Sequence, residues 1–325
     1  MLIDTNPPFR HQADSKAAER RRNPLKYLGG AQLTLARGFD YAGHGLSVPS
    51  FARFGPFCVL TGALSLPKKY VGSVLAVLPT KCRPEKELIF EAHMGGEEGV
   101  LLDVNSEGEL RLMIQRDHPR VFLDGVVIPV ASAYGVRLTP NPPWLPYGGH
   151  SALPRYYAAG GLCVLSGRLR LQYDDLNMWQ DTIVTKLPDE CRPRDDGVLI
   201  FTVNHHDATQ GIKVHPDGRL QYFAGTIKVP WLSLNGIMFF TRSNSQPLEL
   251  NKFWVARSKG FRIPSYRRSG RLCLLSGVAT RLGKLLHDQT SADIIVTKLP
   301  EECRPLKRLV FSTNQEQTVR SVSVC

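Results

Sequence analysis

The sequence predicts an all-β protein built from tandem antiparallel β-sandwich domains of the jelly-roll type, the last of which is incomplete. Three observations lead to this fold class. Two phrases occur three times along the chain, short apolar runs are bounded by turn residues, and no long segment carries an apolar stripe of helical period. The 23 Pro and 28 Gly residues recur at strand-length intervals, which is typical of turns between short strands.

The repeated phrases define the domain organisation. The first is an apolar strand that contains Cys and ends in Ser-Gly or Thr-Gly, at residues 56–62, 161–167 and 271–277. The second reads Leu-Pro-x-x-Cys-Arg-Pro, at residues 78–84, 187–193 and 299–305. A spacing of about 105 to 110 residues suits a whole small domain rather than a solenoid unit. We therefore predict a basic, disordered tail at 1–30, repeat 1 at 31–132, repeat 2 at 133–245, and a truncated repeat 3 at 246–325.

Local patterns within the repeats predict strands and a hairpin. The segment from Leu162 to Leu171 is apolar at first and then alternates between apolar and polar residues, the period of a half-buried strand. Asp217-Gly218 lies between two apolar runs, and Gly accepts the positive φ that a tight hairpin turn requires.

The third repeat differs from the others in how it ends. Repeats 1 and 2 close with Leu-Asp-Gly-Val at 123–126 and Leu-Asn-Gly-Ile at 234–237, whereas repeat 3 contains neither the Asp-Gly hairpin nor this closing sequence. Either the chain is cut short or something else completes the unit. Because several buried side chains are missing, we expect repeat 3 to be unstable alone, and so disordered, docked on repeat 2, or completed by another chain.

Composition limits the classes of protein. With 42% hydrophobic residues, each repeat can bury a core, and no apolar run reaches the ~20 residues of a membrane span. The N-terminal segment lacks the apolar core of a secretory signal, so a cytoplasmic location is favoured if that terminus is genuine. The net charge of +12 leaves nucleic-acid binding as an alternative function, although no aromatic and basic RNA-binding motif is present.

Six of the seven cysteines form one pair in each repeat. The pairs are Cys58 with Cys82, Cys163 with Cys191, and Cys273 with Cys303. Neither the spacing within a pair nor the neighbouring residues match a metal site. Each pair is either a disulfide, which would contribute about 3 kcal/mol, or two small buried thiols. If they are disulfides, all three pairs should have Cα atoms within about 7 Å.

Other polar residues are candidates for chemistry. The densest cluster is His205-His206-Asp207, which would suit a metal-dependent enzyme, but the other two repeats have no such cluster. The acidic pairs at 174–175 and 195–196 fall in predicted loops, where adjacent side chains do not converge. Ser166 and Ser276 follow an apolar strand without the surroundings of a nucleophile elbow, so we expect their hydroxyls to bond backbone groups at strand ends.

One polar residue recurs in every repeat. It is an arginine directly before proline, at Arg83, Arg192 and Arg304. These side chains are the candidate binding residues, through contact with an anion or a carboxylate once per domain. The alternative is structural: proline holds an extended loop, and the arginine packs its stem and bonds a nearby carbonyl.

In order and content, these phrases resemble the head domains of bacteriophage tail fibres and receptor-binding proteins. Those domains have a strand ending in Leu-Arg-Gly, a Leu-Pro-x-Gly-Tyr-Arg-Pro phrase and a closing Trp-Val-x-Leu-x-Gly-Ile strand, similar to Trp231–Ile237 here. The chain also resembles repeats in uncharacterised dinoflagellate proteins, which carry the Cys version. The resemblance covers residues 31 to 325 and implies an antiparallel β-sandwich, often trimeric in phage, used for binding. Cys in place of the phage Tyr, and tandem copies in one chain, depart from the phage pattern.

The repeated residues are mostly those of packing and turning, so we predict a non-enzymatic binding or scaffold protein. We expect a protein or glycan partner, no cofactor, no metal and, through the resemblance, a homotrimer. A basic nucleic-acid-binding protein is the first alternative, and a metal-dependent enzyme with its site in repeat 2 is the second.

Overall fold

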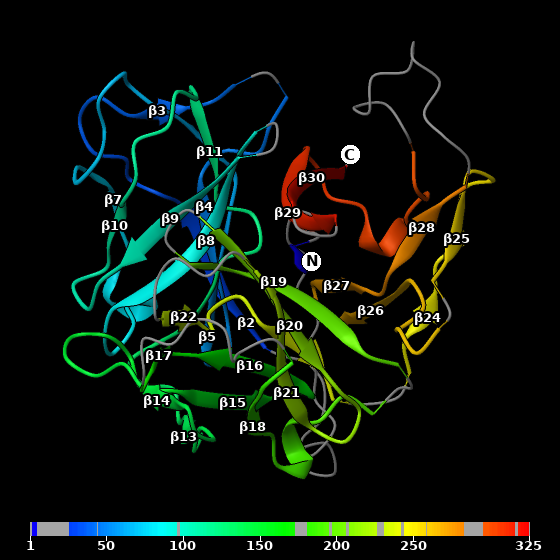
Figure 1. Ribbon diagram of the computed structural model, residues 1–325. Helices are drawn as coiled ribbons and strands as arrows, with labels where there is room; N and C mark the ends of the chain where they lie inside the picture. Colours follow the sequence, from blue (N-terminus) through cyan, green and yellow to red (C-terminus); the bar gives the residue numbers. More distant parts are fainter. Residues whose placement is uncertain are drawn as a thin grey trace, which may run out of the picture.

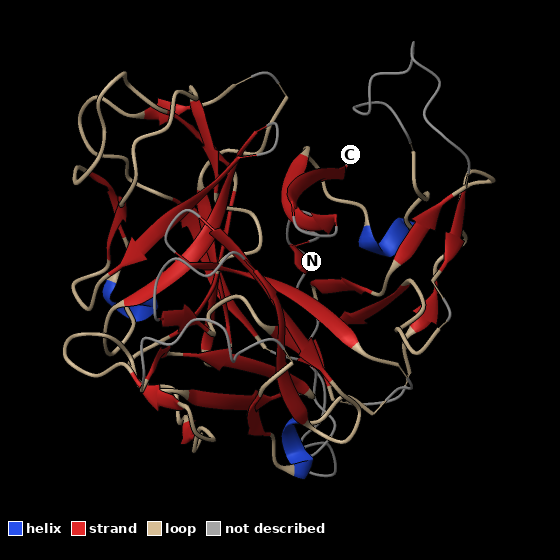
Figure 2. Cartoon of the chain, in the orientation of Figure 1, coloured by secondary structure: helices blue, strands red, loops and turns tan. Residues whose placement is uncertain are grey.

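The computed structural model describes residues 2–4, 26–43, 45–95, 98–172, 181–194, 197–205, 208–225, 231–241, 244–257, 259–282, 295–315 and 318–324. These residues form antiparallel sheets joined by loops, with three short 3-10 helices among them (Figure 2). The prediction of an all-β protein is confirmed. Within the described part of the chain, no helix is both long and apolar enough to cross a membrane.

Repeat 1 contains two sheets around one core. The larger has the order β3 (Asp40–Tyr41), β6 (Ala63–Ser65), β11 (Arg120–Phe122), β8 (Leu88–Gly95), β9 (Glu98–Val104), β10 (Glu109–Leu112), β7 (Val74–Val77). The smaller has the order β12 (Val127–Pro129), β5 (Phe57–Thr61), β4 (Ser50–Phe54), β2 (Tyr27–Gln32). The buried cluster between them runs in sequence from Leu33 to Val130.

Repeat 2 follows the same plan with its outer sheet in two parts. The first sheet is β13 (Val136–Arg137), β15 (Arg155–Ala159), β16 (Leu162–Ser166), β23 (Met238–Phe240). The others are β14 (Trp144–Pro146), β17 (Arg168–Leu171), β22 (Trp231–Ser233), and β18 (Ile183–Lys186), β21 (Arg219–Gly225), β20 (Ala208–Val214), β19 (Leu199–His205). The predicted hairpin joins β20 to β21, with Gly218 at a φ of 88°.

The described residues of repeat 3 form fewer strands than those of repeats 1 and 2. A four-stranded sheet has the order β1 (Leu2–Asp4), β27 (Leu272–Ser276), β26 (Ser265–Ser269), β24 (Gln246–Pro247). Two pairs complete the described part, β25 (Trp254–Ala256) with β28 (Ala279–Arg281), and β29 (Leu309–Gln315) with β30 (Thr318–Val324). The short helices lie after the Leu-Pro turn of each repeat, as η1 (Thr80–Cys82), η2 (Asp189–Cys191) and η4 (Glu301–Cys303).

The single strand predicted from Leu162 to Leu171 is in fact two strands in different sheets. The chain breaks at Gly167, whose φ is 107°, and passes from β16 into β17. A Cβ at Gly167 would lie 2.4 Å from the carbonyl oxygen of Leu153, so no other residue fits without movement. Gly62 and Gly277 have the same positive φ and the same close contact with the segment before Pro. The sequence pattern did not reveal the break because an apolar run before Gly167 and an alternating run after it are both compatible with one continuous strand.

The apolar strand of each repeat is buried on both faces. In β16, Cys163 and Leu165 belong to the core of repeat 2, whereas Leu162 and Val164 belong to a second cluster shared by all repeats. The shared cluster contains Ala52, Phe54, Phe57, Val59, Val127, Tyr157, Leu162, Val164, Met238, Phe240, Leu272 and Leu274. Burial on both faces explains why this phrase is almost continuously apolar. The repeats are therefore not independently packed domains, since each contributes one sheet face to a common core.

The three repeats close into a ring. Equivalent isolated parallel bridges join neighbouring repeats at Glu87 with Ser151, Val198 with Phe261, and Arg308 with Leu46. These connect repeat 1 to 2, 2 to 3, and 3 back to 1. Figure 1 shows the repeats around a common centre, where β8 and β19 contact each other and β29 contacts both.

The N-terminal strand corrects two expectations. Residues 1–30 were predicted to be a disordered tail, but Leu2–Asp4 form β1, which pairs with β27 of repeat 3, and β2 begins at Tyr27. Residues 5–25 lie outside the described residues, and for them the prediction stays untested. Leu2 lies opposite Leu274, just as Val127 lies opposite Val59 and Met238 opposite Val164. The strand that pairs with β27 in repeat 3 thus comes from the other end of the same chain. The sequence had instead predicted that repeat 3 would be disordered, docked on repeat 2 or completed by another chain. The apolar pair Leu2-Ile3 suits this place beside a buried strand.

Candidate binding site at the junction of repeats 1 and 2

An asparagine from repeat 2 holds the first junction together. The Gly167 N–H donates to Oδ1 of Asn235 at 3.0 Å, within repeat 2. The Asn235 Nδ2 donates across the junction to the carbonyl oxygen of Ile89 at 2.9 Å, and the Ser233 hydroxyl donates to the same oxygen at 2.6 Å. Asn235 is buried, so these bonds form away from water. They fix β8 of repeat 1 against β22 of repeat 2.

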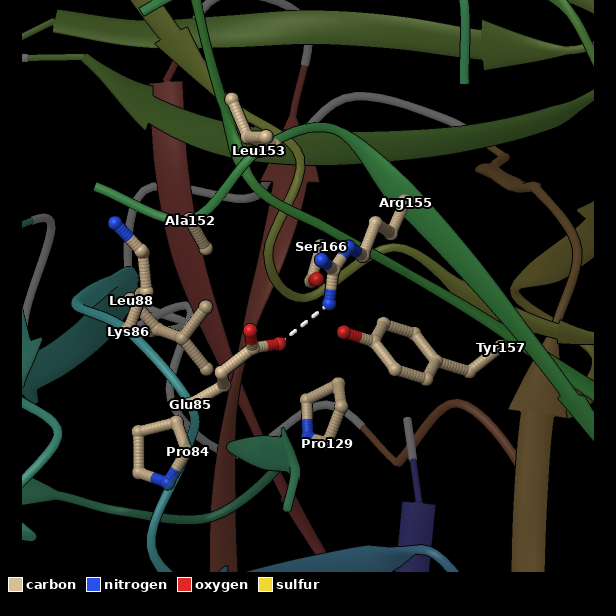
Figure 3. A pocket seen from close by; sticks show the side chains of 10 residues that line it. All are labelled: Pro84, Glu85, Lys86, Leu88, Pro129, Ala152, Leu153, Arg155, Tyr157 and Ser166. Carbon is tan, nitrogen blue, oxygen red and sulfur yellow. Dashed lines mark hydrogen bonds and ion pairs between the residues drawn. The ribbon is translucent and has the colours of Figure 1, made fainter. Parts of the chain in front are cut away.

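A small cavity opens beside this junction (Figure 3). Its walls come from both repeats: Pro84, Glu85, Lys86, Leu88, Pro129, Ala152, Leu153, Arg155, Tyr157 and Ser166. Across it, Nη1 of Arg155 lies 2.5 Å from Oε2 of Glu85, and Lys86 Nζ donates to the Gly149 carbonyl at 3.3 Å. The Glu85 side chain is about half exposed, so the ion pair contributes little to stability. Its effect is to present a charged, partly exposed rim.

An arginine is held between two aromatic rings at the other side of the junction. The Arg168 guanidinium carbon lies 3.8 Å from the ring centres of both Tyr147 and Trp231. Its Nη1 donates to the Ser151 hydroxyl at 3.4 Å, and that hydroxyl donates to Glu87 Oε2 at 2.9 Å. Tyr147 is 40% exposed, so this stack presents an aromatic surface to solvent.

Burial shifts the charges at this junction. Desolvation lowers the pKa of Arg168, although Tyr147, Glu87 and Asp103 oppose the change. Burial, helped by Glu87, raises the pKa of Asp103 to about 6. On the junction face of β8, burial raises the pKa of Glu91 to about 7, and neither of its carboxylate oxygens has a hydrogen-bond partner among the described residues. The Glu91 side chain is therefore mostly protonated, and so uncharged, below about pH 7.

The size of the cavity limits its chemistry. Its volume is about 30 Å³, which is room for water. A pocket that encloses a small-molecule substrate needs roughly 300 Å³ or more. The junction therefore offers polar and aromatic groups at an open surface, which suits contact with a larger partner.

The repeated arginines all make the same internal contact. Nε donates to the carbonyl oxygen of the preceding Leu-Pro turn at 3.1 Å from Arg83, 2.8 Å from Arg192 and 2.9 Å from Arg304. In repeats 1 and 2 the arginine also lies against the hairpin glycine: a Cβ at Gly218 would be 2.6 Å from Arg192 Nε. Arg192 pairs in addition with Asp189. The structure thus assigns these side chains an internal hydrogen bond, and binding through their remaining N–H groups stays a prediction.

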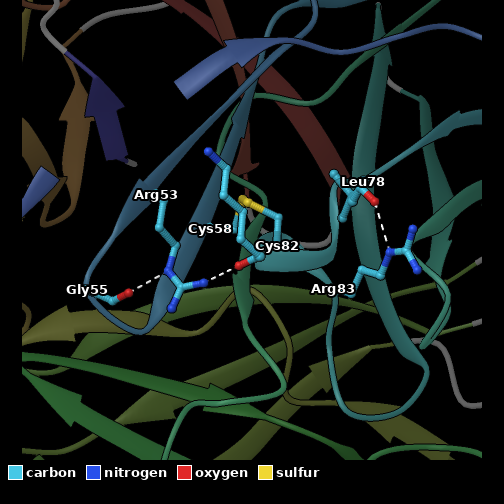
Figure 4. The surroundings of a disulfide bond; sticks show 7 residues. Arg53, Gly55, Cys58, Leu78, Cys82 and Arg83 are labelled. Atoms are coloured by element: carbon cyan, nitrogen blue, oxygen red, sulfur yellow. Dashed lines mark hydrogen bonds between the residues drawn. A yellow bond between two sulfur atoms is a disulfide. The ribbon is translucent and has the colours of Figure 1, made fainter. Parts of the chain in front are cut away.

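The cysteine pairs are joined as disulfides in all three repeats. Their Cα–Cα distances are 5.3 Å, 5.3 Å and 5.6 Å for the pairs that begin at Cys58, Cys163 and Cys273. All six cysteines of these pairs are fully buried. In repeat 1 the bond ties β5 to η1, and nearby Arg53 donates to the carbonyl oxygens of Gly55 and Lys81 (Figure 4). Of the two alternatives, the structure contains the disulfide, and the three pairs behave alike as the repeat alignment requires.

Several other candidate residues fall elsewhere. The cluster at 205–207 lies outside the described residues except for the backbone of His205, and so do both acidic pairs, 174–175 and 195–196. Within the described segments, no group of His, Cys, Asp and Glu could hold a metal ion. Among the described residues, the Ser166 hydroxyl is buried without a hydrogen-bond partner, and the Ser276 hydroxyl lies 3.4 Å from that of Ser265. The expectation that these hydroxyls bond backbone groups was therefore wrong. Both serines lie where the chain changes sheet; Ser166 is buried and lines the small cavity, and Ser276 is half-buried.

Sequence reasoning missed the residues that matter most at the junction. Asp124 and Asn235 stand at the same place in the repeated closing sequence, and the sequence analysis gave neither of them a role of its own. The signal was the persistence of an Asx residue before Gly in both copies. Arg168 gave no signal, because repeats 1 and 3 have Ala63 and Val278 after the same glycine.

No protein-family model matches the chain, and no curated protein matches it.

Proposed function

We propose that this protein is a non-enzymatic binding module in which three β-sandwich units are fused in one chain and display surface groups to a protein or glycan partner. The observation that carries the proposal is that repeated and unrepeated residues have different roles. The repeated residues serve the framework, as disulfides, arginine–carbonyl bonds and sheet-changing glycines. By contrast, the charged residues at the junction of repeats 1 and 2, such as Arg168 and Glu85, are not repeated in the other copies.

The junction has the composition of a recognition surface. Tyr147, stacked on Arg168, offers a rigid aromatic face with a polar hydroxyl, and on the other side of the junction the exposed Glu85 and the half-buried Arg155 provide an acceptor and donors. Aromatic and arginine side chains contribute most of the energy of protein contacts, and aromatic rings also stack on sugar rings. The shallow cavity favours a partner that lies across the surface over one that is enclosed.

The resemblance to phage receptor-binding heads supports the same reading. Those heads are often trimers of separate chains, and here three units within one chain meet around a shared apolar core. We therefore propose that the fused ring takes the place of a homotrimer, so that the protein binds as a monomer.

The test is a combined glycan and protein array probed with the full chain. Binding that is lost in Tyr147→Ala but kept in Tyr41→Ala would support the proposal, because Tyr41 is similarly exposed on β3 of repeat 1. The two variants must unfold at the same temperature. Turnover of a substrate, or binding equal in both variants, would contradict it.

A second candidate function follows from the distribution of charge. Residues 246–325 contain 14 Lys and Arg against 6 Asp and Glu, a net +8 of the +12 of the chain. Several of these lie close together: the buried Arg262 and Arg267 repel each other, which adds to the lowering of the pKa of Arg262 by burial to about 10. A basic region of this kind attracts nucleic acid or another acidic polymer.

This second candidate has a direct test. Binding of a random-sequence oligonucleotide should weaken steeply between 50 and 200 mM salt, by about three orders of magnitude or more for six or more phosphate contacts. Because the charge lies in one repeat and not on a face spanning several, we expect weak retention. The absence of retention at low salt would remove this candidate.

A further inference from the structure

The strand pair β25–β28 of repeat 3 has an inner face and an outer face. Exposure alternates along both strands, with Val255 and Thr280 each exposed between two half-buried residues. Successive side chains of a strand point to opposite faces, and Val255 lies opposite Thr280. The pairing continues one step further, because the Leu282 N–H donates to the Phe253 carbonyl at 2.7 Å. Phe253, Val255, Thr280 and Leu282 therefore share the outer face.

This outer face is largely apolar. The side chains of Phe253, Val255 and Leu282 are 48%, 40% and 49% exposed, and we call these three residues the outer patch. The same face of the other repeats carries polar residues at the paired positions, Asp40 with Ser65 in repeat 1 and Leu145 with Arg170 in repeat 2. The fold therefore does not require an apolar surface here. Contiguous exposed apolar side chains mark a site of contact with a protein or a membrane.

Basic side chains border the outer patch. The Lys252 ammonium lies 5.1 Å from the centre of the Phe253 ring. Arg257, two residues after Val255, is exposed at the other end of β25. Among the described residues, the acidic side chain nearest to these along the chain is Glu249, and residues 246–325 carry a net charge of +8. The apolar side chains thus lie within a positively charged region.

The patch lies away from the site proposed above. Figure 1 shows β25 and β28 at the rim of the molecule, far from the centre where β8, β19 and β29 meet and from β14 and β17 at the junction of repeats 1 and 2. Contact with a partner at this rim does not use the junction, so it is independent of the protein or glycan partner proposed there.

A lipid surface fits both properties of this region. Apolar side chains enter the boundary between headgroups and acyl chains, while lysine and arginine remain at the level of the phosphates. A nucleic acid would use the positive charge, but it would leave the aliphatic Val255 and Leu282 in water, because its bases stack on aromatic rings. We propose that the outer patch and its basic border bind the surface of a lipid bilayer that contains anionic phospholipids.

The experiment measures co-sedimentation of the full chain with vesicles of phosphatidylcholine alone, or with about one third phosphatidylserine. We expect retention by the anionic vesicles alone, weakened by salt. The double variant Phe253→Ser, Leu282→Ser should bind them at least about tenfold more weakly, since two side chains no longer leave water. The matched control is Val77→Ser, Met113→Ser, which changes two side chains of repeat 1 that are each 44% exposed, and it should bind as the unmodified chain does.

Two further variants report on the mode of contact. Lys252→Gln, Arg257→Gln should weaken binding to anionic vesicles about tenfold or more, because each basic residue near such a surface adds to its attraction. In Phe253→Trp, the added emission should shift to the blue on binding. The proposal is overturned if anionic vesicles do not retain the chain, or if phosphatidylcholine alone retains it equally. Equal retention of the Phe253→Ser, Leu282→Ser protein would also overturn it, and would indicate a basic surface for nucleic acid or another acidic polymer.

Discussion

Two junctions of the ring use the same main-chain frame with different side chains. Between repeats 1 and 2, the neutral Asn235 donates to the carbonyl oxygen of Ile89. Between repeats 3 and 1, the acidic Asp124 accepts from the N–H of Val310 at 2.8 Å, and from Gly62 at 2.7 Å. The two Asx residues lie at equivalent points, so exchanging an amide for a carboxylate has reversed the direction of one hydrogen bond.

The surroundings of the two bridges differ as well. The junction of repeats 3 and 1 is apolar, with Ala42, Leu46, Ala63, Phe122 and Val310 in one cluster. The junction of repeats 1 and 2 instead holds the charged Arg168, Glu87 and Asp103. The comparison teaches that the same backbone bridges join the repeats at both junctions, whereas the side chains around the bridges differ and can be apolar or charged.

The largest effect is expected from breaking the first bridge. Asn235→Ala removes the acceptor for Gly167 and the donor to Ile89 in a buried place, so we expect a loss of about 2–4 kcal/mol of unfolding free energy. Denaturant titration measures this loss. Asn141→Ala is the matched control, since its Nδ2 makes one exposed bond to the Ile183 carbonyl, and it should cost less than about 1 kcal/mol. Equal costs would show that the bridge does not hold the junction.

A smaller gain is expected at Glu91, on the same junction face. Burial raises its pKa from 4.5 to about 7, so the stability that its protonated form contributes is complete below pH 4.5 and is lost as the pH rises to about 7. Glu91→Gln should therefore be more stable than the unmodified protein at pH 8, by about 1–3 kcal/mol, and nearly equal at pH 4.5. Repeats 2 and 3 have Thr202 and Ser312 at this position. A constant difference across that pH range would contradict the assignment.

Asp124→Asn tests the comparison itself. Burial raises the Asp124 pKa to about 7 despite two backbone hydrogen bonds, so its contribution to stability also falls between about pH 4 and 7. The amide has one acceptor oxygen for the two N–H groups of Gly62 and Val310, so its Nδ2 would face a donor, and we expect the variant to be about 1–3 kcal/mol less stable at pH 6. The difference between the two proteins should change with pH only over this window. Thermal unfolding from pH 4 to 8 measures it, and a parallel pair of curves would refute it.

The smallest effect is expected at the exposed ion pair. Glu85→Gln leaves Arg155 without its charged partner at the cavity rim, and we expect a change below about 1 kcal/mol that disappears in high salt. Urea titration at low and high salt gives the value. A loss as large as that of Asn235→Ala would mean that this ion pair, and not the amide bridge, holds the junction.

The sequence predicted the parts of the fold that depend on local patterns. The strands, the hairpin at Asp217-Gly218 and the equivalence of the cysteine pairs follow from alternation, turn chemistry and repetition. Ring closure could not be predicted, because it depends on contacts such as Arg308 with Leu46, which are far apart in the chain. The break at Gly167 and the role of β1 were hidden for a related reason: glycine permits the break, but the segment at Leu153 packs against it, and β1 is placed by its pairing with β27.

The central claim is that the three repeats close into a ring within one chain, and the Val310 amide reports on it most directly. Its N–H is bonded to Asp124 of repeat 1, so residue-resolved hydrogen exchange should show it protected to a similar degree as the β29–β30 ladder. In Asp124→Ala the protection at Val310 should fall sharply while that ladder is retained. Rapid exchange at Val310 in the unmodified protein, with the ladder intact, would show that repeats 3 and 1 do not meet.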